Sequence, residues 1–481
     1  ILVLARTNKK IKNLNNKYNS TKNQYTKYIE DENIGLNIMT ESEAEELEES
    51  KDVVSVEENI KLEGNGRQQD LNPNQIVSDW NKDIINVHDK KQVNVATKNK
   101  VKVAIIDSGV DECDGIEVKE RYNLVPSEKD CLPVYDDITG HGTAVASIIA
   151  GSKVKDRKST GINSNVELYS IKIMDGDNTA PLSRVIEAIY KAIEYDVDII
   201  NMSFGTTKNS EILHQAVRDA YESGILMIAA AGNRGEGDKK VEYPAAYEEV
   251  MAVGAINSNG DISDISSTGA EVDVMAPGEL VKTATNFGLE TISSGTSMAA
   301  PHVVGVASIL WQKDKSKPVD FIRRLIEESA KEITNKGEDI AIIDAQYALN
   351  KYTEFNNNYN DESYRIKENI NTIDVTLEME KVTARWSKDN HAALVTNNRN
   401  TNLTTEQLKW IRAGIRYNDR WLSNDYSKQE MWHSLKKHTR EPNYMAAMSL
   451  VGKIINKKDC NTSSFKIGRS CLLYTSPSPR D

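Results

Sequence analysis

Residues 101–109 read Val-Lys-Val-Ala-Ile-Ile-Asp-Ser-Gly, and this stretch decides the fold. It is a short apolar run, typical of a strand buried on both faces of a sheet, and it ends on a carboxylate, Asp107. Downstream, similar apolar runs alternate with stretches of helical spacing. The predicted strands cover 166–173, 197–202, 225–231 and 250–255, and the predicted helices cover 141–150, 182–195 and 211–221. This alternation predicts an α/β fold, a doubly wound and mostly parallel sheet with helices on both faces.

The composition is that of a globular protein. The chain has 481 residues, of which 60 are basic and 72 acidic, and its formal net charge is −12. This acidic balance argues against nucleic acid as the main partner. Apolar residues make up 39% of the chain, which is enough for a sizeable core. The sequence contains no run of about 18 apolar residues, so it predicts no membrane span. Four cysteines are too few for a disulfide-dense scaffold, and whether Cys113 and Cys131 pair is left open.

The N-terminal part divides into two segments. Ile1 to Ala5 read either as the end of a signal-peptide apolar region or as five ordinary residues, so 1–19 are predicted to be a leader remnant or disordered. Residues 20–70 contain an acidic helical run at 41–49 and a short strand after it. Gly64 to Gln69 then read as a flexible linker.

The rest of the chain divides into three segments. Residues 71–355 hold the alternating pattern and are predicted to be the α/β domain. Residues 356–470 carry a net positive charge and are predicted to be an accessory region with an aromatic core, whose surface is either an ordinary charged one or a site for an anionic polymer. They contain four of the six tryptophans, Trp386, Trp410, Trp421 and Trp432. Residues 471–481 resemble translated sequencing-adapter DNA and are set aside.

Three short segments carry side chains suited to nucleophilic catalysis. Asp107 follows the buried strand, His141 opens a small-residue helix, and Ser297 opens another. A serine hydroxyl is a weak nucleophile that needs a base to take its proton, and a histidine suits that role near neutral pH. A buried carboxylate fixes the imidazole and stabilises its charged form. Since function gathers at the carboxyl ends of parallel strands, these residues predict an acyl-transfer site.

Two further groups predict stabilisation of a developing oxyanion. Asn233 follows a predicted strand within Ala229-Ala-Ala-Gly-Asn-Arg-Gly235, and its side chain can donate a hydrogen bond. The backbone N–H of Ser297 lies at a predicted helix N-terminus, where N–H groups favour negative charge.

Five segments, spread over 101–311, together resemble the motifs of the subtilisin family of serine endopeptidases, the subtilases. They are IIDSGVD, GHGTAVAS, NMSFG, AAAGNRG and SGTSMAAPHVVG. The resemblance implies a subtilisin-like fold and hydrolysis of peptide bonds through an acyl-enzyme, with Asp107, His141, Ser297 and Asn233 as the catalytic residues. The chain departs from the family where the second histidine of GHGTHVA is Ala144, a position outside the triad.

The resemblance also implies substrate-binding residues. Ser203, Phe204 and Gly205 resemble the edge strand that pairs with a peptide backbone, and Asp175 and Gly176, with Asp177, resemble the facing strand. Ala230, Ala231 and Gly232 resemble a wall of the primary specificity pocket. Glu242 falls where many relatives have Gly at the base of that pocket. It is either a determinant of basic P1 residues or a solvated loop carboxylate.

Residues 20–62 resemble the inhibitory propeptide of this protease class, so the resemblance implies a self-processing zymogen whose own propeptide is a partner, with a junction within 62–75. It implies secretion or a cell-surface location and protein or peptide substrates. No cofactor is expected for the chemistry; relatives bind structural calcium, but no metal ligand can be assigned here. Two alternatives remain open: a processing protease dedicated to one peptide precursor, and a catalytically idle binding protein on the same scaffold.

Overall fold

The chain forms two compact units, Ile1–Tyr352 and Thr353–Asp481. The computed structural model describes residues 2–5, 27–29, 34–36, 41–50, 53–64, 66–69, 79–87, 100–111, 116–128, 136–154, 157–235, 240–284, 290–335, 338–360, 372–377, 382–387, 392–397 and 465–467. Within these ranges every helix is too short or too polar to serve as a membrane span. Cys113, Cys131 and residues 471–481 lie outside the described residues.

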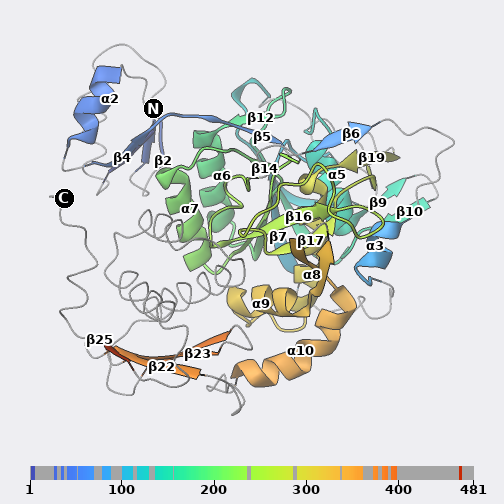
Figure 1. Cartoon of the computed structure of the whole chain (residues 1–481). Coiled ribbons are helices and arrows are strands. Elements are labelled where there is room, and N and C mark those ends of the chain that lie inside the picture. The colour runs from blue at the N-terminus through green and yellow to red at the C-terminus, as the bar shows by residue number, and fades with distance from the viewer. Residues whose placement is uncertain are drawn as a thin grey trace. The chain divides into compact units, whose positions relative to one another are not determined.

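A nine-stranded sheet forms the centre of the first unit (Figure 1). Neighbouring strands from β21 to β8 pair in parallel, and β20 adds an antiparallel hairpin at one edge. The order across the sheet is β20 (Lys331–Asn335), β21 (Glu338–Ile342), β17 (Val274–Pro277), β16 (Val250–Ile256), β15 (Leu226–Ala230), β13 (Ile199–Met202), β7 (Val101–Asp107), β11 (Val166–Lys172) and β8 (Val118–Asn123). The predicted parallel sheet is therefore confirmed.

Strand β7 lies where the strand order reverses. β11 flanks it on one side and β13 on the other, so that Ile106 is opposite both Ile171 and Met202. In open parallel sheets, functional groups gather outside the carboxyl ends of the strands at such a point. Asp107, the last residue of β7, lies there.

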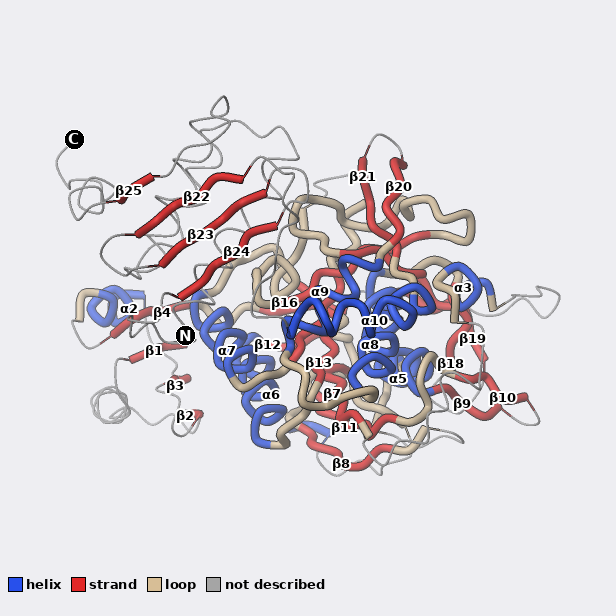
Figure 2. The backbone as a smooth tube through the Cα atoms, turned by 90° about the horizontal axis from the view of Figure 1, so that it is seen from below, coloured by secondary structure: helices blue, strands red, loops and turns tan. Residues whose placement is uncertain are grey.

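Helices cover both faces of the sheet, as predicted. On one face, α5 (His141–Ala150) packs against α8 (Thr296–Trp311), which crosses β13, β15, β16 and β17 and contacts α9 (Val319–Ser329). On the other face, α6 (Leu182–Glu194) and α7 (Glu211–Glu222) pack together and against the sheet (Figure 2). The ends of α6 and α7 lie within one residue of the predicted ends.

The apolar stripe and the N-cap explain why α7 forms where it does. Ile212, Leu213, Ala216, Val217 and Ala220 recur at helical spacing and are all buried. The Ser210 side chain accepts a hydrogen bond from the backbone N–H of Leu213 at 3.0 Å, which satisfies one of the first N–H groups of the helix.

Two small antiparallel sheets lie beside the carboxyl ends of the central strands. In one, β5 (Lys61–Gly64) lies between β12 (Thr179–Pro181) and β14 (Phe204–Gly205). In the other, β6 (Arg67–Gln69) pairs with β19 (Glu290–Ser294), which also pairs with β18 (Val281–Ala284). The prediction of a flexible linker over 64–69 is wrong for Gly64 and for Arg67–Gln69, because these residues belong to strands β5 and β6.

The N-terminal segment forms a four-stranded sheet and a helix of its own. The order across the sheet is β2 (Lys27–Ile29), β3 (Ile34–Leu36), β1 (Leu2–Ala5) and β4 (Val53–Glu57). The helix α2 (Glu41–Glu48) packs on β4. Strands β1 and β4 contact α7, and the buried Ile34 belongs to the same apolar cluster as Val185 of α6. This sheet therefore shares a core with the α6–α7 face.

The remaining elements lie outside these sheets and the helices that cover them. They are the hairpin β9 (Gly151–Val154) and β10 (Arg157–Thr160), a 3-10 turn at Pro126–Glu128, α3 (Trp80–Ile84), α10 (Ala345–Asn360), and the sheet of β24 (Ala392–Asn397), β23 (Val382–Ser387), β22 (Thr372–Leu377) and β25 (Phe465–Ile467). Trp386 lies on β23, and the other three tryptophans of 356–470 lie outside the described residues, so the aromatic core stays a prediction.

His302 anchors helix α3 to helix α8. Its Nδ1–H donates to the Met298 carbonyl at 2.8 Å, and its Nε2 accepts from the Asn81 amide of α3 at 2.9 Å. The side chain is completely buried, and this burial lowers the pKa of His302 from 6.5 to about 4. His302 is thus a neutral packing residue rather than a ligand or a base.

We expect His302 to make the protein less stable in weak acid. The unfolded chain takes up this proton near pH 6.5, whereas the folded chain takes it up only near pH 4, so stability falls as the pH drops through that window. The loss is roughly 3 kcal/mol. Urea unfolding between pH 7 and 4, in a Ser297→Ala background that prevents self-digestion, measures it. An equal pH dependence in His302→Gln would contradict this assignment.

Candidate active site

The Asp107 and His141 side chains meet at the carboxyl end of β7. His141 Nδ1 lies 2.7 Å from Asp107 Oδ1, and both side chains are buried. Asp107 Oδ1 also accepts the backbone N–H of Ser108 at 2.8 Å. These contacts fix the carboxylate, which in turn fixes the imidazole with its Nε2 edge directed away from Asp107.

The close approach of α5 to β7 brings His141 to Asp107. Gly142 sits so near the chain after β7 that a Cβ atom there would lie 2.0 Å from the Gly109 carbonyl oxygen. Only glycine allows this packing. His141 is the first residue of α5, and Gly140 before it has a φ of 77°.

Ser297 lies in the first turn of α8, and its carbonyl is held from outside the helix. Pro301 has no N–H to offer the carbonyl four residues back, which belongs to Ser297. The Ser203 hydroxyl donates to this carbonyl instead, at 3.0 Å, and accepts from the Asn201 amide at 2.9 Å. Ser203 therefore connects the residue before β14 to the first turn of α8, which carries Ser297.

Asn233 is oriented by the residue that precedes Ser297. Its Oδ1 accepts from the backbone N–H of Thr296 at 2.9 Å and from the Thr296 hydroxyl at 3.1 Å. The Thr296 hydroxyl also accepts from the Gly232 N–H at 3.1 Å. Since Oδ1 is committed to Thr296, the Nδ2 end of the amide is the end that can donate to a substrate.

The backbone of Gly66 shows that the nucleophile and the base converge. A Cβ atom at Gly66 would lie 2.5 Å from Ser297 Oγ and 2.7 Å from His141 Nε2. The two atoms therefore flank one point, the position that a Cβ atom of residue 66 would take, and the Gly66 backbone lies next to it. Among the described residues His141 Nε2 has no hydrogen-bond partner, so this nitrogen is not committed to a structural contact.

The predicted edge strand lies where the sequence analysis placed it, and the facing strand lies four residues later in the chain than predicted. Phe204 and Gly205 form β14 and pair with β5. Asp175 and Gly176 belong to a turn, in which the Asp175 carboxylate accepts from the Asp177 and Thr179 N–H groups, both at 3.3 Å. The strand that faces β14 is β12, at Thr179–Pro181, because the turn must close before extended pairing can begin.

The wall of the predicted pocket and Glu242 lie against each other. Ala230 ends β15 and Ala231 follows it, and the Ala231 carbonyl accepts the Glu242 N–H at 2.9 Å. A Cβ atom at Gly232 would lie 2.8 Å from Glu242 Cγ. Glu242 is only 6% exposed, so it is not a solvated loop carboxylate. Its Oε1 accepts from Arg234 Nε at 2.9 Å, an ion pair that the sequence did not reveal.

Comparison with known proteins agrees with this geometry. The model of the subtilase family, described as Peptidase_S8, matches residues 98–367, more than half of the chain. The chain belongs to the subtilase family.

Similar subtilases come from several bacteria. The chain is 35% identical to the minor extracellular protease Epr of Bacillus subtilis over 302 residues, which are 61% of this chain and 45% of that protein. It is 36% identical to subtilisin DY of Bacillus licheniformis over 52% of this chain and 89% of that protein. It is 38% identical to the intracellular serine protease of Paenibacillus polymyxa over 44% of this chain and 67% of that protein. The chain thus spans less than half of Epr.

The described part of this subtilase offers no carboxylate cage for a metal ion. No group of three or more His, Cys, Asp or Glu side chains within the described ranges is placed to hold one. Structural calcium, which the family resemblance implies, therefore has no ligand set among these side chains.

Asp137 is a second buried carboxylate that the sequence did not single out. It accepts from the Ser108 hydroxyl at 2.7 Å, from the Gly140 N–H at 2.8 Å, and from both the N–H and the hydroxyl of Thr143 at 2.7 Å. It therefore joins the end of β7 to the first turn of α5. The sequence around Asp136-Asp137 carries no motif, so it did not predict that Asp137 is buried or that it binds these donors.

The charges of Asp107 and Asp137 both affect the pKa of His141. Burial alone would lower the pKa of His141, but the charge and hydrogen bond of Asp107, aided by the charge of Asp137, raise this pKa above its ordinary value of 6.5. The imidazolium is therefore stabilised where a general base needs it.

We expect Asp137→Asn to lower kcat for peptide hydrolysis and to move its acid limb to lower pH. The amide removes a charge that raises the pKa of His141, so the base becomes neutral at lower pH. Asp136→Asn is the matched control, because Asp136 is buried beside Asp137 but is not among the groups that shift this pKa. Equal pH profiles for the two variants would contradict a positioning role for Asp137.

Proposed function

We propose that this subtilase is a serine endopeptidase that is made as a self-processing zymogen. One observation carries the proposal: Ser297 Oγ and His141 Nε2 lie 2.5 and 2.7 Å from the position that a Cβ atom of Gly66 would take, while His141 Nδ1 is 2.7 Å from Asp107. A nucleophile, a base and an orienting carboxylate in line are the parts that acyl transfer requires.

The proposed roles follow from the contacts. Ser297 Oγ attacks the peptide carbonyl, and its proton passes to His141 Nε2. Asp107 keeps the Nδ1 proton in place and stabilises the imidazolium. The Asn233 amide and the Ser297 N–H stabilise the oxyanion, and one such side-chain donor typically contributes about 3–4 kcal/mol. His141 then gives the proton to the leaving amine, and water hydrolyses the acyl-enzyme. The reaction as proposed needs no cofactor, and structural calcium stays a proposal without assigned ligands.

Occupation of the substrate strands by the chain's own residues supports the zymogen proposal. A bound peptide is expected to add a strand between β14 and its facing strand. β5 does this: Gly64 lies opposite Phe204, and Leu62 lies opposite Ala180. A foreign substrate cannot bind there until β5 leaves.

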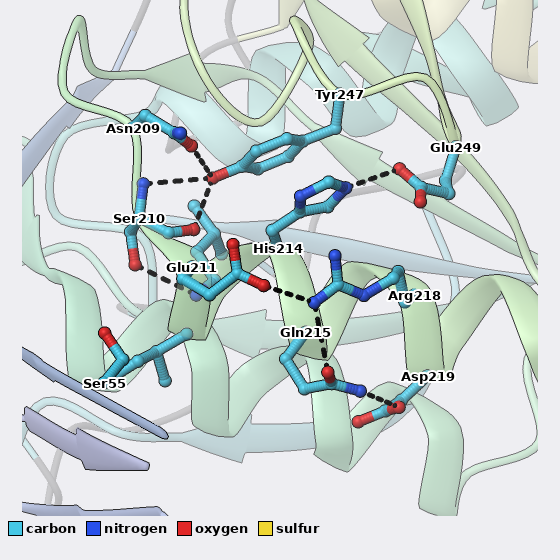
Figure 3. Close-up of polar contacts among 12 residues, drawn as sticks. Ser55, Asn209, Ser210, Glu211, His214, Gln215, Arg218, Asp219, Tyr247 and Glu249 are labelled. Carbon is cyan, nitrogen blue, oxygen red and sulfur yellow. Dashed lines mark hydrogen bonds and ion pairs between the residues drawn. The ribbon is translucent and has the colours of Figure 1, made fainter. Parts of the chain in front are cut away.

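Polar contacts from the N-terminal segment to α7 support its role as a bound inhibitor. Glu57, at the end of β4, accepts the Glu211 N–H at 2.9 Å and the Ile212 N–H at 3.3 Å, and it accepts from the Ser210 hydroxyl. A carboxylate at a helix N-terminus is favourable because it meets unpaired N–H groups and the positive end of the helix dipole. Ser210 is held in turn by Tyr247, whose hydroxyl donates to the Ser210 carbonyl at 2.7 Å (Figure 3).

Helix α6 receives a similar cap. Asn59 Oδ1 accepts the Ser183 N–H at 2.8 Å, and the Ile60 carbonyl accepts the Leu182 N–H at 2.8 Å. The segment 57–60 thus satisfies the starts of both α6 and α7. Such contacts hold the N-terminal segment as a partner of the folded protease unit.

Glu242 is the proposed source of a preference for Lys or Arg at P1, weakened by Arg234. The carboxylate lies at the pocket wall formed with Gly232, but Arg234 already pairs with it. Because Arg234 is 44% exposed, water screens this pair and its contribution is small. The wild-type preference for basic P1 residues is therefore expected to be modest.

Secretion or a cell-surface location is part of the proposal, with proteins or peptides as substrates. The similarity to a protein named an extracellular protease supports it, and the similarity to an intracellular serine protease keeps a dedicated processing role inside the cell as the alternative. Broad digestion of casein would favour the degradative role, and one cut in one precursor would favour processing.

A serine-directed phosphonate should label the processed protein at Ser297. Ser297→Ala should abolish the labelling and lower peptide hydrolysis by about 10⁶-fold, because no other group can form the acyl-enzyme. Ser308→Ala is the control, since Ser308 is a buried hydroxyl of the same helix that donates to the Gly305 carbonyl. Undiminished hydrolysis by Ser297→Ala would refute the mechanism.

Arg234→Ala should raise the ratio of kcat/KM for P1 Lys over P1 Leu by about fivefold, which corresponds to about 1 kcal/mol. Glu242→Gln should abolish the basic preference. Peptides that differ only at P1 measure both, and Arg324→Ala, which removes an ion-paired arginine of α9, is the control. A preference for Leu that neither pocket variant changes would contradict the role of Glu242.

A further inference from the structure

Strand β5 shows how closely the substrate strands fit a bound peptide at one position. β5 lies between β12 and β14, where a substrate is proposed to lie (Figure 1). Gly64 of β5 is opposite Phe204 of β14, and on the other side its N–H donates to the Asn178 carbonyl at 3.1 Å. The backbone of residue 64 is therefore held from both sides, and the strand sets the direction of any side chain there.

The Asn178 side chain closes the space beside Gly64. A Cβ atom on residue 64 would lie 2.2 Å from Asn178 Nδ2, 2.8 Å from its Cγ and 2.9 Å from its Oδ1. Carbon atoms in contact are about 3.5–4.0 Å apart, so all three distances are too short. The amide of Asn178 therefore lies where the side chain of a bound residue would begin.

The contact with Asn178, and not the backbone conformation, is what requires a glycine at residue 64. Gly64 is not among the described glycines with a positive φ, so its backbone conformation suits any residue. A glycine inside a strand often marks the close approach of another group. The neighbouring side chains have room, because Leu62 is buried in an apolar cluster and Glu63 is exposed.

The turn that carries Asn178 is fixed by hydrogen bonds. The Asn178 N–H donates to the Asp175 carbonyl at 2.9 Å, and the Asp175 carboxylate accepts from the N–H and the hydroxyl of Thr179, both at 3.3 Å. A substrate side chain therefore has to displace the Asn178 amide rather than the turn. Among the described residues Asn178 Oδ1 has no hydrogen-bond partner, so packing alone resists this displacement. We expect a strong preference for glycine rather than a complete block.

We propose that Asn178 makes this protease select substrates with glycine at one place, the glycine position, which Gly64 fills in this structure. The inference rests on the proposed endopeptidase function and names its substrate class. In a bound peptide, the residue in the place of Gly66 lies beside Ser297 and His141, and it is the first residue on one side of the cut bond or the other. The selected glycine is therefore the second or third residue before the cut bond.

Peptide pairs with Gly or Ala at the second or at the third residue before the cut bond test the proposal in the processed protein. In one pair, kcat/KM should be about tenfold higher or more for Gly, because the Ala methyl overpacks the glycine position. Asn178→Gly should make the two values about equal, and glycine suits the φ of 57° at this residue. Asn86→Gly is the control, because Asn86 also has a positive φ but bonds to Asp344.

The outcomes separate this inference from the proposed function. Equal hydrolysis of the Gly and Ala peptides in both pairs, by protein that a serine-directed phosphonate labels, would overturn the inference and leave the proposed function intact. A glycine preference that Asn178→Gly keeps would do the same. Absence of both labelling and hydrolysis of every peptide would overturn the proposed function and this inference with it.

Hydrogen exchange in the full-length Ser297→Ala chain tests the contact without hydrolysis. Gly64→Ala should speed exchange of the β5 N–H groups by about tenfold or more, because the added methyl pushes the strand from Asn178. Asn178→Gly, added to Gly64→Ala, should restore the slower exchange. Lys61→Ala changes an exposed residue of the same strand and should leave the exchange unchanged. Equal exchange in Gly64→Ala and Lys61→Ala would contradict the closed glycine position.

Discussion

The buried hydrogen bond between Asp107 and His141 is the contact on which the rest of the site depends. It joins the last residue of β7 to the first residue of α5, 34 residues later in the chain. The close approach at Gly142 and the shared hydrogen bonds of Asp137 hold the two elements at this separation. The Ser108 N–H and hydroxyl donate to Asp107 Oδ1 and replace part of the water that burial removes. Loss of this geometry would leave Ser297 without a base.

The same backbone edges serve both the proposed inhibition and the proposed catalysis. β14 and β12 hold β5 through strand pairing, which uses main-chain groups and tolerates many side chains. Leu62 fixes the register because it is the buried side chain between exposed neighbours. Glu57 and Asn59 add polar contacts at the starts of α7 and α6. The N-terminal segment therefore covers helix ends and strand edges of the α/β unit that would otherwise be exposed.

The sequence predicts those parts of the fold that local pattern controls. The apolar runs at 101–106, 166–173 and 250–255 become central strands, and helical spacing places α6 and α7 within one residue. Asp107, His141 and Ser297 follow from the same pattern, because each stands at the end of a strand or the start of a helix. The oxyanion role of Asn233 stays a prediction, supported by the orientation that Thr296 imposes.

The features that the sequence did not predict depend on contacts between distant residues. Residues 64–69 have the composition of a linker, but Gly64 joins β5 and Arg67–Gln69 form β6, because β14 and β19 offer backbone edges for pairing. The turn at Asp175 shifts the facing strand to Thr179–Pro181, since side-chain hydrogen bonds to nearby N–H groups compete with strand pairing. Arg234 pairs with Glu242, which lies eight residues later in the chain, and Asp137 acquires its partners only when α5 packs against β7.

The charge state of His141 tests the central claim most directly. In the uncut Ser297→Ala chain, labelled with ¹⁵N at histidine, NMR titration should give His141 a pKa above 6.5, because Asp107 stabilises the imidazolium. Asp107→Asn should lower that pKa in the same chain. A His141 pKa at or below 6.5 that Asp107→Asn leaves unchanged would show that the two side chains do not meet, and would contradict this account of the site.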